Sequence, residues 1–331
     1  MKATVTILVL LTSAMLSSSS SGVFAGEPMK VKFSIPLTHV KGGFDLMAAD
    51  VAGKRLFLAA EDNNTMEVLD IAAGKHLRSV GGLNEPKWIV YRPESNRLYV
   101  SNGGDGSVRV LDARTLVQVR QFSFKEKANN LRYDSKTKKL FVGVGKTFGA
   151  IGIIDTANDT ILPEISIANY PKQFEVEDNR IFVNVPVVNH IAVIDRGRNC
   201  VAATWPVAES QGNVPMGFDR EHHRLFVGCE PGKFVVLDSV TGKSVASLDI
   251  KPGSDGIYYD TNRHHVYVSC GAGSIEVIRQ ADADHYELIA SVPTAEGAAT
   301  SLFVPELDVF CLAVPQKEGQ TAELRVYDVV R

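Results

Sequence analysis

Short hydrophobic blocks recur along the chain at an interval of about 42 residues. Most copies begin with a basic residue and continue with three aliphatic, β-branched or aromatic residues, as in Arg97-Leu98-Tyr99-Val100. Runs of this kind, bounded by turn-forming residues, predict β-strands. The seven copies begin at Arg55, Arg97, Lys139, Arg180, Arg224, His265 and Asp308, at steps of 42, 42, 41, 44, 41 and 43 residues.

A second hydrophobic series runs in phase with the first, about a dozen residues later. It ends in an acidic residue in every repeat but the sixth, which has Arg279. An Asp that is repeated in this way and followed by turn residues is best explained by side-chain hydrogen bonds to the turn backbone, without any chemistry. These residues are Asp70, Asp112, Asp155, Asp195, Asp238 and Asp328.

Each repeat holds four hydrophobic runs separated by polar turns; in the second repeat they cover 88–91, 97–101, 107–111 and 117–122. Four strands in a unit of this length are typical of one blade of a β-propeller. The sequence therefore predicts an all-β, seven-bladed propeller with four-stranded antiparallel blades. The predicted blades start near residues 43, 86, 128, 171, 214, 255 and 299.

The last repeat stops three residues after Asp328 and lacks a fourth strand. An isolated strand pattern at 30–37 precedes the first repeat instead. We expect this segment to pair with the strand at 324–329 and to close the last blade, because an unpaired sheet edge promotes aggregation.

The N-terminus has the layout of a secretory signal peptide. Lys2 precedes an apolar stretch at 5–16, five serines follow, and Val23-Phe24-Ala25 has small residues at its first and third positions. We expect cleavage after Ala25, a periplasmic or secreted protein, and a single propeller over 26–331. An uncleaved N-terminal anchor is the alternative, and no other stretch approaches the length of a membrane span.

Composition adds limits on the partner. The chain has 331 residues, 45% of them hydrophobic and 22% charged, which is ordinary for a globular protein. Its formal net charge of −3 disfavours a surface that coats nucleic acid, since such a surface is basic. We expect a protein, a glycan or a small molecule as the partner, and a monomer.

Tyr99-Val100-Ser101-Asn102, followed by Ser107 to Asp112, resembles the YVTN-type repeat of bacterial β-propellers. The segments 226–228 and 267–269 are looser copies, and the resemblance spans about residues 30–331. It is similar to exported YncE-like proteins. The resemblance implies the fold and export. It leaves the function open, because function depends on sites and not on folds.

Several chemistry-bearing residues have a structural explanation. Gly145-Lys146-Thr147 lacks the first glycine and the following helix of a phosphate-binding loop. The pairs His222-His223 and His264-His265 occupy equivalent turns of neighbouring repeats, so we expect solvated histidines and not a metal site. The four cysteines, which are Cys200, Cys229, Cys270 and Cys311, show no metal-site spacing. We expect them to be free thiols, although a disulfide between Cys200 and Cys229 remains an alternative.

Polar residues in two sets of loops are the candidate ligand-binding residues. These are the loops between blades and the loops between the second and third strands of each blade, which meet on one face of a propeller. The candidates are His39, Lys87, Trp88, Asn102, Asp105, Asn130, Lys172, Asn184, His190 and Asp255. We also consider a divalent metal at the axis, for which the weak candidate ligands are Glu61, Asp105, Glu230 and Asp255.

Three functions are compatible with these residues. The first is an exported binding or scaffold protein that recognises its ligand at the rim or in the central funnel, with no cofactor. The second is a lactone hydrolase that uses a metal-activated water. The third is a subunit resembling those of quinoprotein amine dehydrogenases. We favour the first, because no nucleophile–base pair or metal triad stands out.

Overall fold

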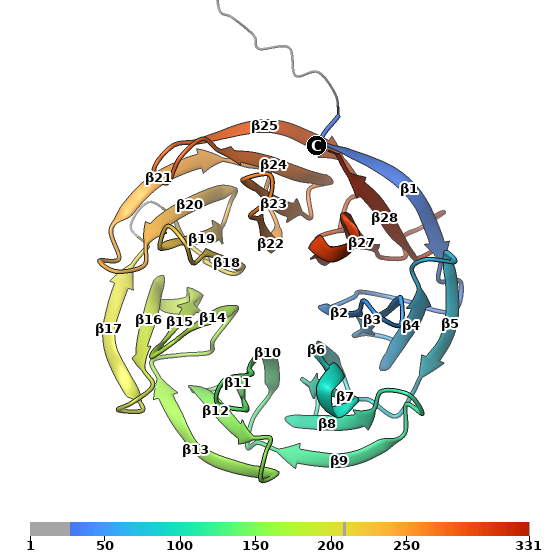
Figure 1. The fold of residues 1–331 in the computed structure, drawn as a ribbon, viewed down its shortest axis with the longest axis horizontal. Coiled ribbons are helices and arrows are strands. Elements are labelled where there is room, and N and C mark those ends of the chain that lie inside the picture. Colours follow the sequence, from blue (N-terminus) through green and yellow to red (C-terminus); the bar gives the residue numbers. More distant parts are fainter. Residues whose placement is uncertain (1–26, 208–209, 331) are drawn as a thin grey trace, which may run out of the picture.

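The computed structural model describes residues 27–207 and 210–330 of the chain. Within these residues, 28 strands form seven four-stranded antiparallel sheets arranged as a ring around a central axis (Figure 1). The all-β, seven-bladed architecture predicted from the repeats is therefore confirmed. The expected signal peptide and its cleavage point lie outside the described residues.

Blades 1 to 6 are built from consecutive strands. The strands of blades 1 to 3 are β2 (Met47–Asp50), β3 (Arg55–Ala60), β4 (Thr65–Asp70), β5 (Lys75–Val80), β6 (Pro86–Arg92), β7 (Arg97–Asn102), β8 (Ser107–Asp112), β9 (Gln118–Ser123), β10 (Ala128–Asp134), β11 (Lys139–Gly145), β12 (Gly149–Asp155) and β13 (Thr160–Ile167). The strands of blades 4 to 6 are β14 (Phe174–Glu177), β15 (Arg180–Val185), β16 (His190–Asp195), β17 (Cys200–Pro206), β18 (Met216–Asp219), β19 (Arg224–Cys229), β20 (Lys233–Asp238), β21 (Ser244–Asp249), β22 (Ser254–Asp260), β23 (His265–Cys270), β24 (Ser274–Gln280) and β25 (Tyr286–Pro293). Short 3-10 helices connect some of the strands: η1 (Pro93–Ser95), η2 (Pro186–Val188) and η3 (Pro305–Leu307).

Blade 7 joins the two ends of the chain. It consists of β26 (Ser301–Val304), β27 (Val309–Val314), β28 (Glu323–Val329) and, as its outermost strand, β1 (Met29–Pro36). β1 runs antiparallel to β28, with Met29 opposite Val329 and Pro36 opposite Glu323. The expected closure by the N-terminal strand is confirmed, and a bulge between Val31 and Phe33 is its one irregularity.

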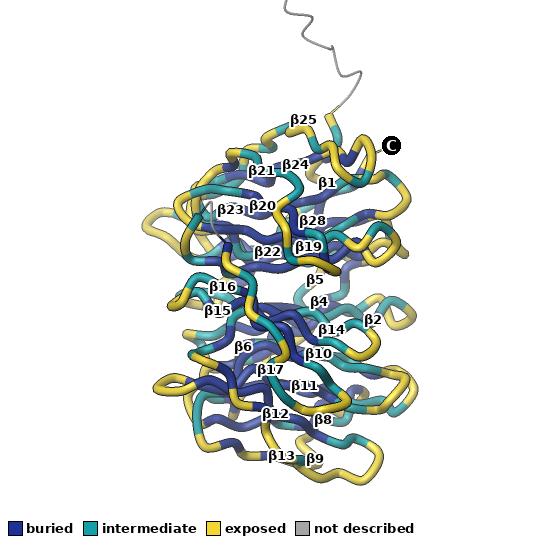
Figure 2. The backbone as a smooth tube through the Cα atoms, turned by 90° about the vertical axis from the view of Figure 1, so that its left-hand side faces the viewer, coloured by how far each residue is buried: buried dark blue, intermediate teal, exposed yellow. Residues whose placement is uncertain are grey.

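The hydrophobic core lies between neighbouring blades and not in one central mass. In Figure 2 the inner strands are buried, and exposure is concentrated in the loops and the outer strands. One cluster packs Phe57 and Met66 of blade 1 against Ile89 and Leu98 of blade 2, and each further junction has a cluster of the same kind. Every blade therefore shares its core with two neighbours.

In blades 1 to 5 the repeated Asp at the end of the third strand stabilises the turn that follows it, as the sequence predicts. Asp70 Oδ1 accepts hydrogen bonds from the backbone N–H groups of Ala72 at 2.9 Å and Ala73 at 2.8 Å. Asp112, Asp155, Asp195 and Asp238 make the same pair of bonds. Asp328 has no such turn, and it pairs with Lys32 of β1 at 2.7 Å instead.

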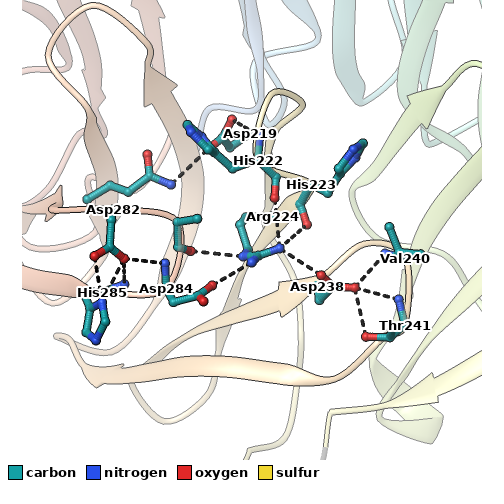
Figure 3. Close-up of polar contacts among 12 residues, drawn as sticks. Asp219, His222, His223, Arg224, Asp238, Val240, Thr241, Asp282, Asp284 and His285 are labelled. Atoms are coloured by element: carbon teal, nitrogen blue, oxygen red, sulfur yellow. Dashed lines mark hydrogen bonds and ion pairs between the residues drawn. The ribbon is translucent and has the colours of Figure 1, made fainter.

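In blades 1, 4 and 5 the arginine that opens the second strand connects neighbouring blades. Arg55 Nη1 donates to the carbonyl of Ala113 at 2.7 Å, and Arg180 Nη1 donates to that of Ser239 at 2.6 Å. Arg224 makes the most extensive set of these contacts (Figure 3). It donates to the carbonyl of Ala283 at 3.0 Å and binds Asp238 at 2.9 Å and Asp284 at 2.6 Å.

We expect Arg224→Ala to lower the free energy of unfolding by about 2 kcal/mol, since it removes hydrogen bonds to the part-buried carbonyl of Ala283 and carboxylate of Asp238 together with the exposed ion pair to Asp284. The melting temperature should fall by roughly 4 °C in a thermal melt. Arg114→Ala, at an exposed arginine whose side chain makes no such contact, is the matched control and should change the melt little. Equal melts for the two variants would contradict a connecting role for Arg224.

The other sequence-derived expectations can be compared directly. All four cysteines are free, so the bridge left open between Cys200 and Cys229 is absent. A strand, β12, follows the Gly145-Lys146-Thr147 segment. Both histidine pairs lie at the turns between first and second strands, and His222 bonds Asp219 at 2.8 Å. No helix among the described residues has the length and hydrophobicity needed to cross a membrane.

Candidate functional site

A cavity of about 940 Å³ opens at one end of the propeller axis. Its walls come from the two sets of loops expected from the sequence: the loops that enter each blade and the loops between second and third strands. The volume lies within the range of small-molecule sites. The lining residues include Asp45, Glu61, Glu85, Lys87, Asp105, Lys125, Lys127, Asn129, Asn130, Lys146, Tyr170, Lys172, Gln173, Val214 and Asp255.

One repeat position supplies most of the inner wall. It lies ten residues before the start of each second strand, at the entry to the first strand of the blade. In blades 1 to 6 this position is occupied by Asp45, Lys87, Asn129, Tyr170, Val214 and Asp255, and all six line the cavity. Blades 1 to 6 thus each place one side chain of this position at the cavity, and differences between repeats at this position determine its chemistry.

The inner wall carries opposite charges in close contact. Lys87, on β6, has a side chain only 5% exposed and forms an ion pair with Glu61 of blade 1. Its Nζ lies 3.9 Å from Oδ2 of Asp45. Asp45 and Asp255 come from blades 1 and 6 and act on each other electrostatically across the cavity.

Burial changes the proton affinity of this group. Desolvation, reinforced by the negative charge of Asp255, raises the pKa of Asp45 to about 7, and nearby Lys87 opposes the shift. Desolvation lowers the pKa of Lys87 to about 8, opposed by Asp45. Burial also raises the pKa of Asp255, opposed by Lys172 and Lys87. A cavity in which burial shifts the pKa values of several groups so that their neutral forms are favoured is typical of functional sites.

Polar groups from blades 3 and 4 complete the wall. Asn129 donates to the hydroxyl of Tyr170, and Lys172 Nζ lies 5.6 Å from the centre of the Tyr170 ring. Gln173 donates to the carbonyl of Asp255 at 2.7 Å, which fixes the blade 6 loop against blade 4. In the part of the chain that the structure describes, Lys172 has no carboxylate within 4 Å, and its charge acts at longer range on Asp255 and Asp45.

The structure brings together five of the ten predicted ligand-binding residues. Lys87, Asp105, Asn130, Lys172 and Asp255 line the cavity. The other five do not line it.

Two of the remaining candidates are fully buried amides that serve the backbone. Asn102 donates to the carbonyl of Val100 at 2.9 Å, and Asn184 donates to those of Val214 and Pro215 at 3.1 and 3.2 Å. Trp88 packs in the core between blades 2 and 3, with Arg132 4.3 Å from its ring centre. His39 is exposed away from the cavity, and His190, whose pKa burial lowers, lies at the start of β16 outside it.

Asp45 and Gln173 are site residues that the sequence reasoning missed. Lys87 and Asp255 lie ten residues before the second strand of their blades, and Asp45 lies at the same position in blade 1. Comparing this position in every repeat would have found the carboxylate. Gln173 carried no such signal, because its role depends on a contact between blades 4 and 6.

The weak metal-ligand candidates do not meet at one point. Glu61 pairs with Lys87, and Asp105 binds Arg109 at 2.7 Å. Glu230 accepts a hydrogen bond from the backbone of Gly253 at 3.2 Å and does not line the cavity. Among residues 27–207 and 210–330, no group of three or more His, Cys, Asp or Glu side chains is arranged to hold a metal ion.

The ring of blades and its axial cavity define this chain as a seven-bladed β-propeller. No protein-family profile and no curated protein sequence matches it. Several solved structures are similar to it in fold. A chain of the Kuenenia stuttgartiensis hydrazine synthase is similar with a TM-score of 0.73 and 17% identity, over 87% of this chain and 97% of that one.

Two further similar structures contain propellers of other systems. A chain of a mitotic checkpoint complex gives a TM-score of 0.78 at 10% identity, over 99% of this chain and 100% of that chain. The WD40 repeats of RRP9 give 0.76 at 9% identity, over 92% and 98%. At these identities the comparisons establish the fold alone, with WD40-like structural neighbours.

Proposed function

We propose that this chain is an exported, YncE-like binding propeller whose axial cavity holds a small polar ligand with a carboxylate and hydroxyl or amino groups. The observation that carries the proposal is the convergence of Asp45, Lys87, Lys172 and Asp255 from four different blades on one cavity. The signal-peptide pattern at residues 1–25 supports export.

The charges of the cavity suggest the class of ligand. Lys172 lines the cavity and, among the described residues, has no carboxylate within ion-pair distance, which suits an anionic group of the ligand. Asp255 and Asn130, on other parts of the wall, suit hydroxyl or amino groups. When the ligand binds, hydrogen bonds between the ligand and the cavity side chains replace the hydrogen bonds that both made to water.

The second function considered, a metal-assisted lactone hydrolase, needs several oxygen ligands around one ion. Of the four candidate metal ligands, Glu61 and Asp105 are engaged with a lysine and an arginine, and Glu230 lies outside the cavity, which favours binding over this chemistry. For that reason we place binding first.

The test is calorimetry and thermal melting of residues 26–331 with glucuronate, citrate and glutamate, and with glucose as the neutral control. We expect at least one carboxylate to bind and to raise the melting temperature, and glucose to do neither. Lys172→Met should weaken that binding by about tenfold, the usual contribution of a charged hydrogen bond.

Lys243→Met, in an exposed turn at the other end of the axis, is the matched control and should bind like the wild type. Absence of binding by all three carboxylates, or equal affinity of the Lys172 and Lys243 variants, would contradict the proposal. Hydrolysis of a lactone that appears only with an added divalent ion would favour the hydrolase.

A further inference from the structure

The part of the rim built by blades 3 and 4 is locally basic on a protein whose formal net charge is −3. We define the blade 3–4 rim as the four loops at residues 125–130, 145–149, 168–173 and 185–190, which lie on the cavity side. Besides His190, these loops hold one acidic residue, Glu126, and four lysines: Lys125, Lys127, Lys146 and Lys172. The rim therefore attracts acidic groups.

The same rim exposes large apolar side chains at its loop tips. Phe148, between β11 and β12, is 48% exposed, and Val187 and Val188, in η2, are 69% and 44% exposed. Both loops connect the second and third strands of their blades, so the tips stand on the same face of neighbouring blades. Exposed apolar groups beside polar ones are typical of protein interaction surfaces.

Both tips are held in place by hydrogen bonds. The Glu126 carboxylate accepts bonds from the backbone N–H groups of Lys146 and Thr147 and from the Thr147 hydroxyl. In the other loop, Asn189 in the left-handed conformation donates its backbone N–H to Pro186, and its side chain donates to the carbonyl of Val207 at 2.9 Å. Fixed tips lose little conformational entropy when a partner covers them.

The remaining acidic groups near the rim are already engaged. Glu85, from blade 2, lies 3.6 Å from Lys127, and Asp105 binds Arg109 at 2.7 Å. Within the described residues, the side-chain ammonium groups of Lys125 and Lys146 form no ion pair, although Glu126 accepts a hydrogen bond from the backbone of Lys146. Both ammonium groups can therefore meet an acidic group of a partner.

We propose that the blade 3–4 rim docks an extended protein segment in which acidic side chains alternate with apolar ones. The apolar side chains would cover Phe148 and Val187, and the acidic ones would meet Lys125 and Lys146. The rim borders a cavity of about 940 Å³, and a hollow favours a segment that can insert side chains over a flat lipid surface. The docking depends on the loop tips and on Lys125 and Lys146, and not on the inner-wall residues Asp45, Lys172 and Asp255. It can therefore hold whether or not the cavity binds a carboxylate ligand.

The test uses a short fluorescein-labelled peptide in which Glu alternates with Leu. We compare it with a Lys–Leu and a Glu–Ser peptide by fluorescence anisotropy. The Glu–Leu peptide should bind at least about tenfold more tightly than either, and more weakly at high salt. Phe148→Ser, the double variant Val187→Ser/Val188→Ser, and Lys146→Glu should each weaken binding by about tenfold, as central interface residues do.

Two variants on the opposite face serve as matched controls: Val240→Ser at a valine 60% exposed, and Lys243→Glu. They should bind the Glu–Leu peptide like the wild type.

The proposal is overturned if the Glu–Leu peptide binds no more tightly than the Lys–Leu and Glu–Ser peptides, or if Phe148→Ser has no effect. It is also overturned if equimolar phosphatidylcholine–phosphatidylserine vesicles or oligothymidylate bind more tightly than the peptide and with the same dependence on Phe148. Asp45→Asn, which alters the cavity and leaves the loop tips intact, should not change peptide binding.

Discussion

Deleting residues 29–38 should lower the melting temperature by more than about 10 °C. The deletion removes β1, whose Ile35 packs in the cluster shared with blade 1 and whose Met29 packs in the cluster shared with blade 6. Fully burying such side chains is worth roughly 2–3 kcal/mol each, and the loss also exposes the edge of β28. We expect a total loss on the order of 5 kcal/mol or more.

Two additions make this result specific to ring closure. A synthetic peptide covering residues 27–38 should restore most of the melting temperature when added to the deleted protein. Lys32→Ala, which removes only the exposed pair with Asp328, should change the melt by little, because such pairs contribute less than about 1 kcal/mol. An unchanged melt after the deletion would refute the closing role of β1.

Asp45→Asn should stabilise the protein at pH 8 and leave it nearly unchanged at pH 4. The carboxyl has a folded-state pKa of about 7, above its ordinary value of 3.8. The folded state therefore binds more protons than the unfolded state between these values, and the wild type loses stability as the pH rises from about 4 to 7. The asparagine variant lacks this loss, and we expect a gain on the order of 2–3 kcal/mol above pH 7; the attraction to Lys87 is already contained in the pKa of about 7.

Thermal melts of the two proteins from pH 4 to pH 8 measure this difference, which should grow with pH to roughly 5 °C. Asp249→Asn, at an exposed carboxylate on β21, is the control and should show no growing difference. A variant that is less stable than the wild type at pH 8 would mean that the charge of Asp45 is balanced by its neighbours. The stability gained by Asp45→Asn would indicate that this carboxylate is kept for function at a cost in stability.

The repeat pattern was sufficient for the fold because each strand of a blade carries its own hydrophobic signal. It predicted even the pairing of the N-terminal strand with the last blade, since one blade lacked a strand and one strand lacked a blade. The cavity was predicted less completely. Loop position gives the face on which a residue lies, and it does not give the direction of the side chain: Asp105 reaches the cavity, whereas Asn102, three residues earlier, is fully buried within its blade.

Contacts between distant blades were the part that no local pattern could supply. Gln173 and Asp255 are 82 residues apart and meet only because the ring brings blades 4 and 6 to the same cavity. The charge state of Asp45 likewise depends on burial and on Asp255, which lies on another blade.

The position of β1 also bears on how the molecule reaches its final shape. Met29 lies opposite Val329, so β1 occupies the place where a hairpin continuing from β28 would run. The natural chain order instead joins segments almost 300 residues apart, as in the bond from Lys32 to Asp328. A circularly permuted chain with β1 attached behind β28 would keep every strand pairing while replacing the most distant one by a local turn, and it should fold faster because its mean contact separation is smaller. In the natural order, β1 precedes its partner β28 by the whole length of the propeller, so this pairing cannot form until β28 has been made.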